Sequence, residues 1–509
     1  MTTILINGKK LDFLLVKEGF EIPSFNFNTE VEKIPGRAGS IKESRELNGY
    51  DFEVPLIVDG SIHTSKANKL DHDSVLNDVV KLFNYNEEVT IQFSDMNWYW
   101  KGFIDGPLNI PKSFLNGTEF TVKIVLADPY KYAVDGNQNT AISDAVSVVN
   151  SGTADTPIIV EARALKDSTN FIIAKDERNY FMIGKSEDAN KVTKDIEPFV
   201  FNDEFHTTGL SNWRYMPNDT SFGNLLDGGD AMGGKFKLSK ERESIYPEIW
   251  GNNTQTNWHG PAIYKSLTKS VQDFRIRFKV SIHQGLGIGT GKAVAFLVDE
   301  NNRTLFSITY VNTSATTNNS QILVYAYNEH NEARRIYKRD VPQQLKRLKN
   351  IHAFIFLERK GTNLKVTTYF YDINKDPDRK KPLNKDERIT VDRGNLYQRP
   401  ARIARLYRGK AAKYSKYLWH SILAFKIQEL LPKQSDVTPI EIREGDLIQI
   451  DMHRKSVTIN DEDALSLKDF GSNYFNVDTG VSELVVYPSE TFDTTVKCKI
   501  DTYRKEDRS

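Results

Sequence analysis

The sequence predicts a mainly all-β protein. Aromatic residues make up 11% of the 509 residues, with 22 Tyr and 28 Phe, and aromatic side chains favour strands. Apolar and charged residues alternate in Arg275–Ile282 (RIRFKVSI), which is the pattern of an antiparallel strand with one buried face. The tract Ser113–Leu126 also has strand character and ends at Asp128-Pro129, a turn signal that marks a boundary.

Two further segments alternate with the same period. They are Leu364–Tyr371 and Val496–Ile500. In the second, Cys498 shares a face with two aliphatic residues and alternates with lysines. We therefore expect this cysteine to be a small core residue rather than a nucleophile.

One segment is predicted to be helical. Asp73 can cap a helix that runs to about Phe83. Its apolar side chains share one face, namely Val75, Val79, Leu82 and Phe83. A helix with a single apolar face is expected to pack on a sheet.

The composition excludes several classes of protein. Hydrophobic residues at 39% and charged residues at 27% are typical of a soluble globular chain. Lys and Arg number 68, as do Asp and Glu, so the net charge is zero and a globally basic nucleic-acid binder is not expected. The single cysteine excludes an intramolecular disulfide and a multi-cysteine zinc site. We recognise no signal peptide and no apolar run of about 18 residues, so we expect folding in a reducing cytoplasm without membrane insertion.

Changes in composition divide the chain into four segments. They are residues 1–133, 138–195, 199–430 and 436–505. The second and fourth are each short for a sandwich, but together they reach the usual size of one. We therefore predict one domain that is interrupted by the third segment, because exposed loops tolerate insertions.

Catalytic patterns are broken or missing. Gly285–Gly291 (GLGIGTG) precedes Lys292 but lacks the P-loop spacing, so it is predicted to be a loop between strands. Asp203-Glu204 and Asp299-Glu300 are adjacent pairs, and neighbours on a strand point to opposite faces. No enzyme and no cofactor are predicted. A structural calcium ion in the third segment stays open, without assigned ligands.

Aromatic and amide side chains in the third segment have the chemistry of a sugar site. Sugar rings stack on aromatic faces, and their hydroxyl groups need polar partners. The candidates are Trp250, Asn253, Trp258, His259, Tyr325 and Tyr327. The alternative for each is core packing or ordinary loop filling.

Basic residues cluster near the end of the third segment. The candidates for binding an anionic polymer are Arg399, Arg402, Arg405, Arg408, Lys410, Lys413 and Lys416. Such a cluster suits a phosphate-bearing partner. The alternative is a solvated charged face.

Short motifs in the outer segments occur in a recognisable order. They are Ile34–Ser40 (IPGRAGS), Phe52–Val58 (FEVPLIV), Trp98–Gly102 (WYWKG), Leu126–Tyr132 (LADPYKY), Val149–Ile159 (VNSGTADTPII) and Ile442–Asp451 (IREGDLIQID). In this order the chain resembles the distal tail proteins of long-tailed, siphovirus-type bacteriophages that infect Gram-positive hosts.

The resemblance implies an architecture for each segment. Residues 1–133 would form an N-terminal ring domain of the β-sandwich type with one helix. Residues 138–195 and 436–505 would form a galectin-like sandwich. Residues 199–430, which open with Phe201–Phe205 (FNDEF), are similar to concanavalin-like jelly rolls. The whole would be the "evolved" form of the family, with an inserted carbohydrate-binding-like module.

The resemblance also implies a role and partners. The chain would form a homo-hexameric ring at the tail tip or baseplate of the virion, after synthesis in the host cytoplasm. It would join the tail tube protein to the tail-associated hub or lysin protein. The insert would bind a host cell-wall polysaccharide or teichoic acid, or contact a receptor-binding protein.

The loop with Gly36, Arg37 and Gly39 is the candidate ring interface, because glycine permits backbone conformations that other residues avoid. Arg37 would pair either with a neighbouring subunit or within its own chain. Two alternatives to the role as a whole stay open. They are a wall-degrading hydrolase in the insert and a non-phage, lectin-like binding protein.

Overall fold

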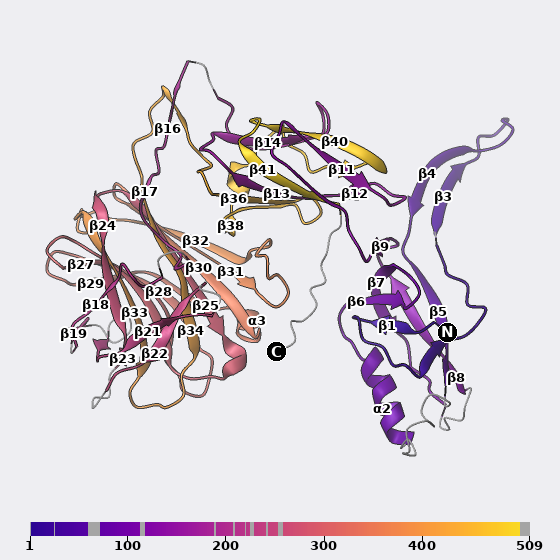
Figure 1. Cartoon of the computed structure of the whole chain (residues 1–509), viewed down its shortest axis with the longest axis horizontal. Helices are drawn as coiled ribbons and strands as arrows, with labels where there is room; N and C mark the ends of the chain where they lie inside the picture. Colours follow the sequence, from indigo (N-terminus) through magenta and orange to yellow (C-terminus); the bar gives the residue numbers. More distant parts are fainter. Residues whose placement is uncertain are drawn as a thin grey trace.

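The computed structural model describes residues 2–24, 26–59, 72–111, 118–187, 190–206, 209–218, 220–223, 229–240, 243–252 and 258–498. The described chain is mainly β-strand, as predicted, and its buried apolar residues form three main clusters. Figure 1 shows three bodies. One is N-terminal, one holds strands from both the middle and the end of the chain, and the third is the long central segment.

The N-terminal body is a seven-stranded sheet with one helix. Its strands are β1 (Ile4–Ile6), β2 (Leu14–Val16), β5 (Tyr50–Val58), β6 (Val89–Phe93), β7 (Trp98–Asp105), β8 (Thr118–Leu126) and β9 (Lys131–Ala133). The sheet curls until its ends meet, where the Val16 amide donates to the Thr2 carbonyl over 2.8 Å. Helix α2 (His72–Phe83) packs its predicted apolar face on the same core, which confirms the helix.

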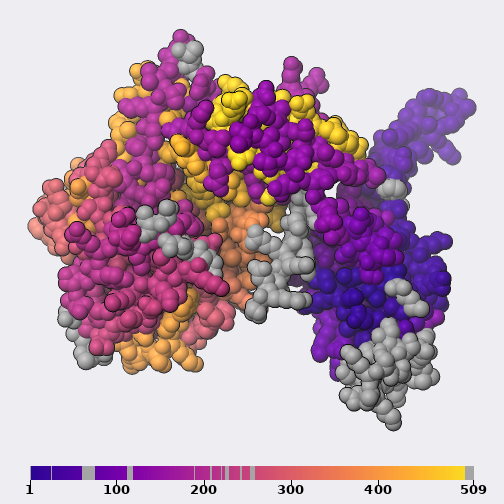
Figure 2. Space-filling view, in the orientation of Figure 1, coloured from indigo at the N-terminus to yellow at the C-terminus, as the bar shows by residue number. Residues whose placement is uncertain are grey.

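A two-stranded hairpin leaves this body. It consists of β3 (Phe27–Glu32) and β4 (Ile41–Leu47), and every residue of β3 is exposed. In Figures 1 and 2 the hairpin extends into free space beyond its domain. The exposed apolar side chains of this hairpin lack the packing partners that strands normally have. A lone two-stranded hairpin is therefore only marginally stable in water.

The second body is a sandwich of two antiparallel sheets. The six-stranded sheet holds β10 (Gln138–Ala141), β13 (Ile159–Ala164), β36 (Leu447–Asp451), β37 (Ser456–Ile459), β38 (Glu462–Asp463) and β41 (Phe492–Lys497). The four-stranded sheet holds β11 (Ala145–Asn150), β14 (Asn170–Ala174), β15 (Tyr180–Gly184) and β40 (Gly480–Tyr487). A short pair, β12 (Thr156–Pro157) and β39 (Asn476–Val477), lies beside them. Cys498 is buried in this core, as predicted.

The central segment is a larger sandwich. Its eight-stranded sheet holds β17 (Phe199–Asp203), β21 (Lys235–Leu238), β22 (Ile245–Ile249), β25 (Phe274–His283), β30 (Asn350–Lys360), β31 (Asn363–Asp372), β32 (Leu383–Val391) and β34 (Trp419–Glu429). The alternation in 275–282 and 364–371 is confirmed by β25 and β31, which bury their apolar residues between the two sheets.

The facing sheet is ten-stranded. It holds β18 (Arg214–Tyr215), β19 (Thr220–Ser221), β20 (Asp230–Ala231), β23 (Trp258–Gly260), β24 (Ala262–Val271), β26 (Gly291–Val298), β27 (Thr304–Asn312), β28 (Gln321–Tyr327), β29 (Ala333–Asp340) and β33 (Ala401–Ala411). A one-turn helix, α3 (Gln343–Lys346), joins the two sheets. From here on, residues 199–430 are called the insert.

The chain enters and leaves the insert at one neck. Strands β16 (Val192–Lys194) and β35 (Val437–Pro439) pair there in parallel. The Glu429 amide donates to the Pro198 carbonyl over 2.9 Å. Entry and exit therefore lie side by side, which lets the smaller sandwich keep its core on both sides of the interruption.

A turn of the smaller sandwich docks on the eight-stranded sheet of the insert. Asn460 and Asp461, both with positive φ, form the tight turn between β37 and β38. It brings Glu462 within 2.9 Å of the Arg277 Nε atom and 3.3 Å of the Lys279 Nζ atom. Both cations point outward from β25, and all three side chains are largely buried in the contact.

An aromatic cluster surrounds this ion pair. Phe354 and Tyr371 pack with Tyr369 on the outer face of the insert's sheet, and the Tyr369 hydroxyl accepts the Asp463 amide over 3.2 Å. The Lys279 Nζ atom lies 4.9 Å from the centre of the Phe354 ring. The contact therefore combines apolar area with paired charge, which is the composition of a fixed interface.

Replacing Glu462 by Gln is expected to loosen the docked insert. The change leaves Arg277 and Lys279 without their buried carboxylate, and breaking a buried pair in this way costs about 3–5 kcal/mol. Small-angle X-ray scattering at pH 7 should show a larger radius of gyration than for the wild type. Glu483→Gln, on an exposed position of β40, is the control. An unchanged radius for Glu462→Gln would contradict this role.

The wild type should undock in acid. Burial by itself raises the pKa of Glu462, but Arg277, Lys279 and Lys426 outweigh it and hold that pKa below its ordinary value. A depressed pKa gives stability that is complete above the unfolded value of about 4.3 and is lost as pH falls through the folded value. The same scattering measurement should therefore be constant from pH 7 to about pH 5 and change only below about pH 4.3.

Candidate functional site

The predicted sugar-binding residues separate into two groups. Trp258, Tyr325 and Tyr327 lie together on the outer face of the ten-stranded sheet, with Val311 and Leu323 between them. Strand alternation explains this, since Tyr325 and Tyr327 are two residues apart on β28. The three rings are only 8%, 7% and 5% exposed. They gather as predicted, but as packed side chains rather than open stacking faces. Asn253 lies outside the described residues.

Lys292 belongs to the same face, although the sequence suggested no role for it. The Lys292 Nζ atom lies 4.7 Å from the Trp258 ring centre and 5.8 Å from that of Tyr407. The Ser307 and Tyr327 hydroxyls are 3.4 Å apart. The face thus joins aromatic rings with polar groups, yet these side chains are buried in this structure.

Trp250 and His259 form the second group, and Trp250 is half-exposed. The His259 Nδ1 atom lies 3.1 Å from the Trp250 carbonyl oxygen. Burial lowers the pKa of His259, and Lys410 lowers it further, so the imidazole is neutral near pH 7. The Lys410 Nζ atom lies 5.2 Å from the Trp250 ring centre. A cation and an accessible aromatic ring therefore adjoin at this point.

The predicted basic patch is not a continuous surface. Arg399, Arg405 and Arg408 are buried. Arg399 pairs with Asp299 and donates to the Tyr327 carbonyl, and Arg408 donates to the carbonyls of Lys292 and His420. Arg405 donates to the Asn302 side chain over 2.9 Å. The three buried guanidinium groups are thus engaged within the insert and offer little charge to an external polymer.

The other members of the basic run are nearer the surface. Arg402 is half-buried and donates to the Leu267 carbonyl over 2.7 Å. Lys410 is half-buried, and Lys413 and Lys416 are exposed on the loop between β33 and β34. The accessible positive charge is therefore carried by the three lysines, beside Trp250.

The adjacent carboxylate pairs serve structural contacts. The Asp203 carboxylate accepts the Phe205 amide over 2.9 Å and the Trp213 indole N–H over 2.8 Å. Glu204 turns to Lys426, at 2.5 Å. Asp299 accepts the Arg303 amide over 2.8 Å and binds Arg399. Asp203 and Glu204 thus turn to different partners. Glu204 and the pair Asp299-Glu300 lie just beyond the ends of β17 and β26, so strand alternation does not separate these carboxylates.

The glycine-rich segment supports the lysine loop. It forms a short 3-10 turn, Gln284–Leu286, and then runs against residues 416–418. A Cβ atom on Gly289 would lie 2.5 Å from the Lys416 carbonyl carbon. The Leu418 amide donates to the Thr290 carbonyl over 3.1 Å. The predicted inter-strand loop is confirmed, and close backbone contact is a physical reason for glycine at position 289.

The candidate ring loop is the tip of the β3–β4 hairpin. Gly36 and Gly39 have φ values of +84° and +85° and nothing within 4 Å of a Cβ position. Arg37 is exposed, and among the described residues it has no ion-pair partner.

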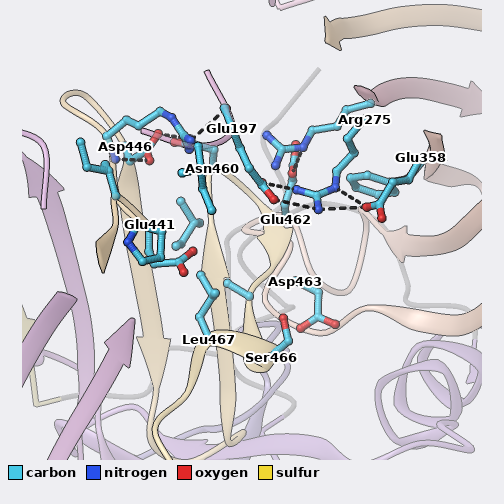
Figure 3. A pocket seen from close by; sticks show the side chains of 18 of the residues that line it. Glu197, Arg275, Glu358, Glu441, Asp446, Asn460, Glu462, Asp463, Ser466 and Leu467 are labelled. Carbon is cyan, nitrogen blue, oxygen red and sulfur yellow. Dashed lines mark hydrogen bonds and ion pairs between the residues drawn. The ribbon is translucent and has the colours of Figure 1, made fainter. Parts of the chain in front are cut away.

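A charged cavity of about 610 Å³ lies at the neck, where the insert meets the smaller sandwich. Figure 3 shows Arg275 between Glu197 and Glu358, at 2.5 Å and 2.9 Å. Burial raises the pKa of Glu441 on its opposite wall, and Glu197 raises it further. No sequence motif marks this cavity, because its walls come from segments far apart in the chain. Because charged side chains in its walls already pair with one another, we interpret this cavity as part of the junction between the two domains.

Two family models match the outer parts of the chain. Residues 6–126 match the phage tail protein RIFT-related domain, and residues 424–500 match the C-terminal domain of the siphovirus-type tail component. The two outer parts of the chain therefore carry domains of siphovirus-type tail components. The resemblance to distal tail proteins is thereby confirmed, and the matches leave residues 127–423 between them, including most of the insert.

Solved structures similar to parts of this tail component include the SPP1 Dit protein, at 19% identity over 36% of this chain and 75% of that one, with a TM-score of 0.31. The CBM2 module of the evolved Dit of Lactobacillus casei BL23 phage J-1 shares 13% identity over 48% and 100%, with a TM-score of 0.37. The laminarinase catalytic domain of Thermotoga maritima MSB8 shares 9% over 47% and 100%, with a TM-score of 0.32. No curated protein matches the chain.

The described residues form neither a helix able to cross a membrane nor a cluster of metal ligands. None of the helices they form has the length and apolar character needed to cross a membrane. Their His, Cys, Asp and Glu side chains include no group of three or more placed to hold a metal ion.

Gly289→Ala should disturb the lysine loop of the tail component. The new methyl group would meet the backbone at Lys416 and Tyr417, and overpacking of this kind costs about 1–3 kcal/mol. We expect a lower free energy of unfolding for the insert, measured by urea titration with tryptophan fluorescence. Gly285→Ala is a matched control, since its Cβ atom would meet Lys349 at an ordinary 3.5 Å. Equal stability of the two variants would rule out the supporting contact.

Proposed function

We propose that this chain is a distal tail protein that forms a hexameric ring at the tip of the phage tail, where it joins the tail tube to the hub. Residues 1–133 would build the ring. Residues 138–195 and 436–505 would form the outward sandwich, and the insert, 199–430, would reach the host surface. The family matches at 6–126 and 424–500 support the tail assignment.

The observation that carries the ring is the projecting β3–β4 hairpin. Val31 is 56% exposed and Ile41 is 38% exposed, and both lie on strands with no third strand beside them. Burial of such side chains against a second copy is favourable by about 1.5–3 kcal/mol each. A protruding arm that meets a different surface of its neighbour makes a head-to-tail contact, and such contacts close into rings.

Arg37 at the tip of the hairpin suits the same contact. Its guanidinium is exposed and has no ion-pair partner among the described residues. An arginine can bind a carboxylate through two parallel hydrogen bonds, which fixes geometry as well as adding energy. Of the two partners considered from the sequence, we therefore favour a carboxylate of the neighbouring subunit.

The insert is proposed to bind a host cell-wall glycopolymer. In the predicted basic run the accessible charge comes from Lys410, Lys413 and Lys416, and Lys410 lies beside the half-exposed ring of Trp250. Aromatic rings stack on sugars, and lysines attract phosphate or carboxylate groups. No observation favours hydrolysis, since the carboxylates of Asp203, Glu204 and Asp299 are engaged by neighbouring groups.

The ring should form in solution and depend on the hairpin. Light scattering on a sizing column should give a mass near six times 58.2 kDa for the full-length chain. Val31→Ser combined with Ile41→Ser should shift it toward the monomer, because the change removes apolar area at the proposed contact. Ile142→Ser, a 55% exposed residue outside the hairpin, should keep the wild-type mass. A hexamer that survives the double change would refute the role of the hairpin.

The full-length ring should bind purified host cell walls in a salt-dependent way. Exposed charges are screened over about 8 Å at physiological ionic strength and over about 3 Å at 1 M, so sedimentation with walls should decrease as salt rises. Removal of wall teichoic acid should weaken binding further. Wall binding that is equal at low and high salt would exclude an electrostatic contribution.

A further inference from the structure

We propose that an aromatic row at the far end of the insert, flanked by the three lysines, is the binding platform for an anionic glycopolymer. The row consists of Tyr246, Trp419, Tyr417 and Trp250. This inference rests on the wall-binding role proposed above and assigns it to particular residues. Of these four residues, the sequence predicts only Trp250 as a binding residue, because the other three are scattered among charged and apolar residues in the sequence.

The four rings form a continuous chain of contacts. The centre of the Trp419 ring lies 5.3 Å from that of Tyr246 and 5.9 Å from that of Tyr417, and the Tyr417 and Trp250 centres are 4.9 Å apart. Each ring is half-buried. The rings therefore support one another and keep part of their surface open, which is the arrangement that stacking against successive sugar units requires.

The backbone holds the row in place. Gly260 has a φ of +157°, and a Cβ atom there would lie 3.1 Å from the Trp250 ring, so the indole rests on bare backbone. Tyr417 is fixed by its bridge to Thr290 in the glycine-rich loop. On β22, Ile245 and Pro247 point into the core and leave Tyr246 on the opposite face. A rigid aromatic platform loses little side-chain entropy on binding.

Positive charge lies along one side of the row. The Lys410 Nζ atom is 5.2 Å from the Trp250 ring centre and 5.5 Å from that of Tyr417. Lys413 and Lys416 stand exposed on the same loop, and none of the three has an ion-pair partner among the described residues. The neighbouring acid, Glu248, already pairs with Lys237 at 3.3 Å. The cations therefore stay available to a negative ligand.

The row also faces away from the rest of the chain. In the pairing of β25 with β34, Glu429 at the neck is opposite Phe274, and Trp419 is opposite His283 at the other end. Ten residues of strand span roughly 33 Å. In Figure 1, the start of β34 lies at the end of the insert opposite β16. A long polymer can thus reach the row without meeting the smaller sandwich.

The test uses the full-length chain and two polymers in titration calorimetry, purified wall teichoic acid and neutral dextran. Trp419→Ala and Tyr417→Ala should each weaken binding of the teichoic acid at least tenfold, and Trp419→Phe should keep most of it. Lys413→Ala with Lys416→Ala should weaken it at low salt and remove most of its salt dependence. Tyr130→Ala and Lys360→Ala, both at exposed positions elsewhere, are the controls.

The possible outcomes distinguish the aromatic row, the anionic ligand and the wall-binding function from one another. Wild-type affinity in the Trp419 and Tyr417 variants would overturn the row and leave wall binding standing. Equal affinity of the wild type for dextran and teichoic acid would overturn the anionic ligand. Failure of the wild-type ring to bind either polymer or cell walls would overturn the wall-binding function itself, and the row with it. Light-scattering mass and thermal unfolding confirm that each variant is folded.

Discussion

The buried contact of Glu462 with Arg277 and Lys279 decides where the insert points. A buried ion pair by itself is weak evidence of stability, because the desolvation of the charges offsets most of their attraction. The apolar cluster of Phe354 and Tyr369 supplies the area that holds the surfaces together. The paired charges instead select one register, since a slide along the sheet would take Glu462 away from Arg277 and leave Lys279 with the more distant Glu204, at 3.9 Å.

The neck alone could not fix this orientation. It consists of two parallel extended segments, 192–194 and 437–439, which pair over only three residues each. Such a connection can bend, and the docked turn removes that freedom. The contact between the insert and the N-terminal body is weaker. It includes the ion pair between Lys375 and Glu87, both of whose side chains are exposed, and exposed ion pairs contribute little to stability. The insert and the smaller sandwich therefore act as one arm.

Sequence patterns predict the strands and helices that bury only one of their faces. Alternation identified β25, the apolar face identified helix α2, and the lysines around Cys498 identified its core position. Arg408 shows the limit. The sequence predicts it as a binding residue for an anionic polymer, but it lies inside the sandwich, where it donates to the carbonyls of Lys292 and His420. Nothing local in the sequence marks such partners, since they come from other strands, and the row from Tyr246 to Trp250 was missed for the same reason.

Packing partners that are distant in the sequence also explain why the accessible site lies at one end of the insert. Rings on the broad outer face of the ten-stranded sheet, such as Trp258 and Tyr325, are covered by their neighbours. Rings at the strand ends, such as Trp419 and Tyr417, pack against other half-buried rings and keep part of their surface exposed. The docked turn holds the middle of β25, at Arg277 and Lys279, and the neck lies at its start, so the end at His283 is the one left free. The constraint that buries Glu462 thus also leaves the aromatic row open.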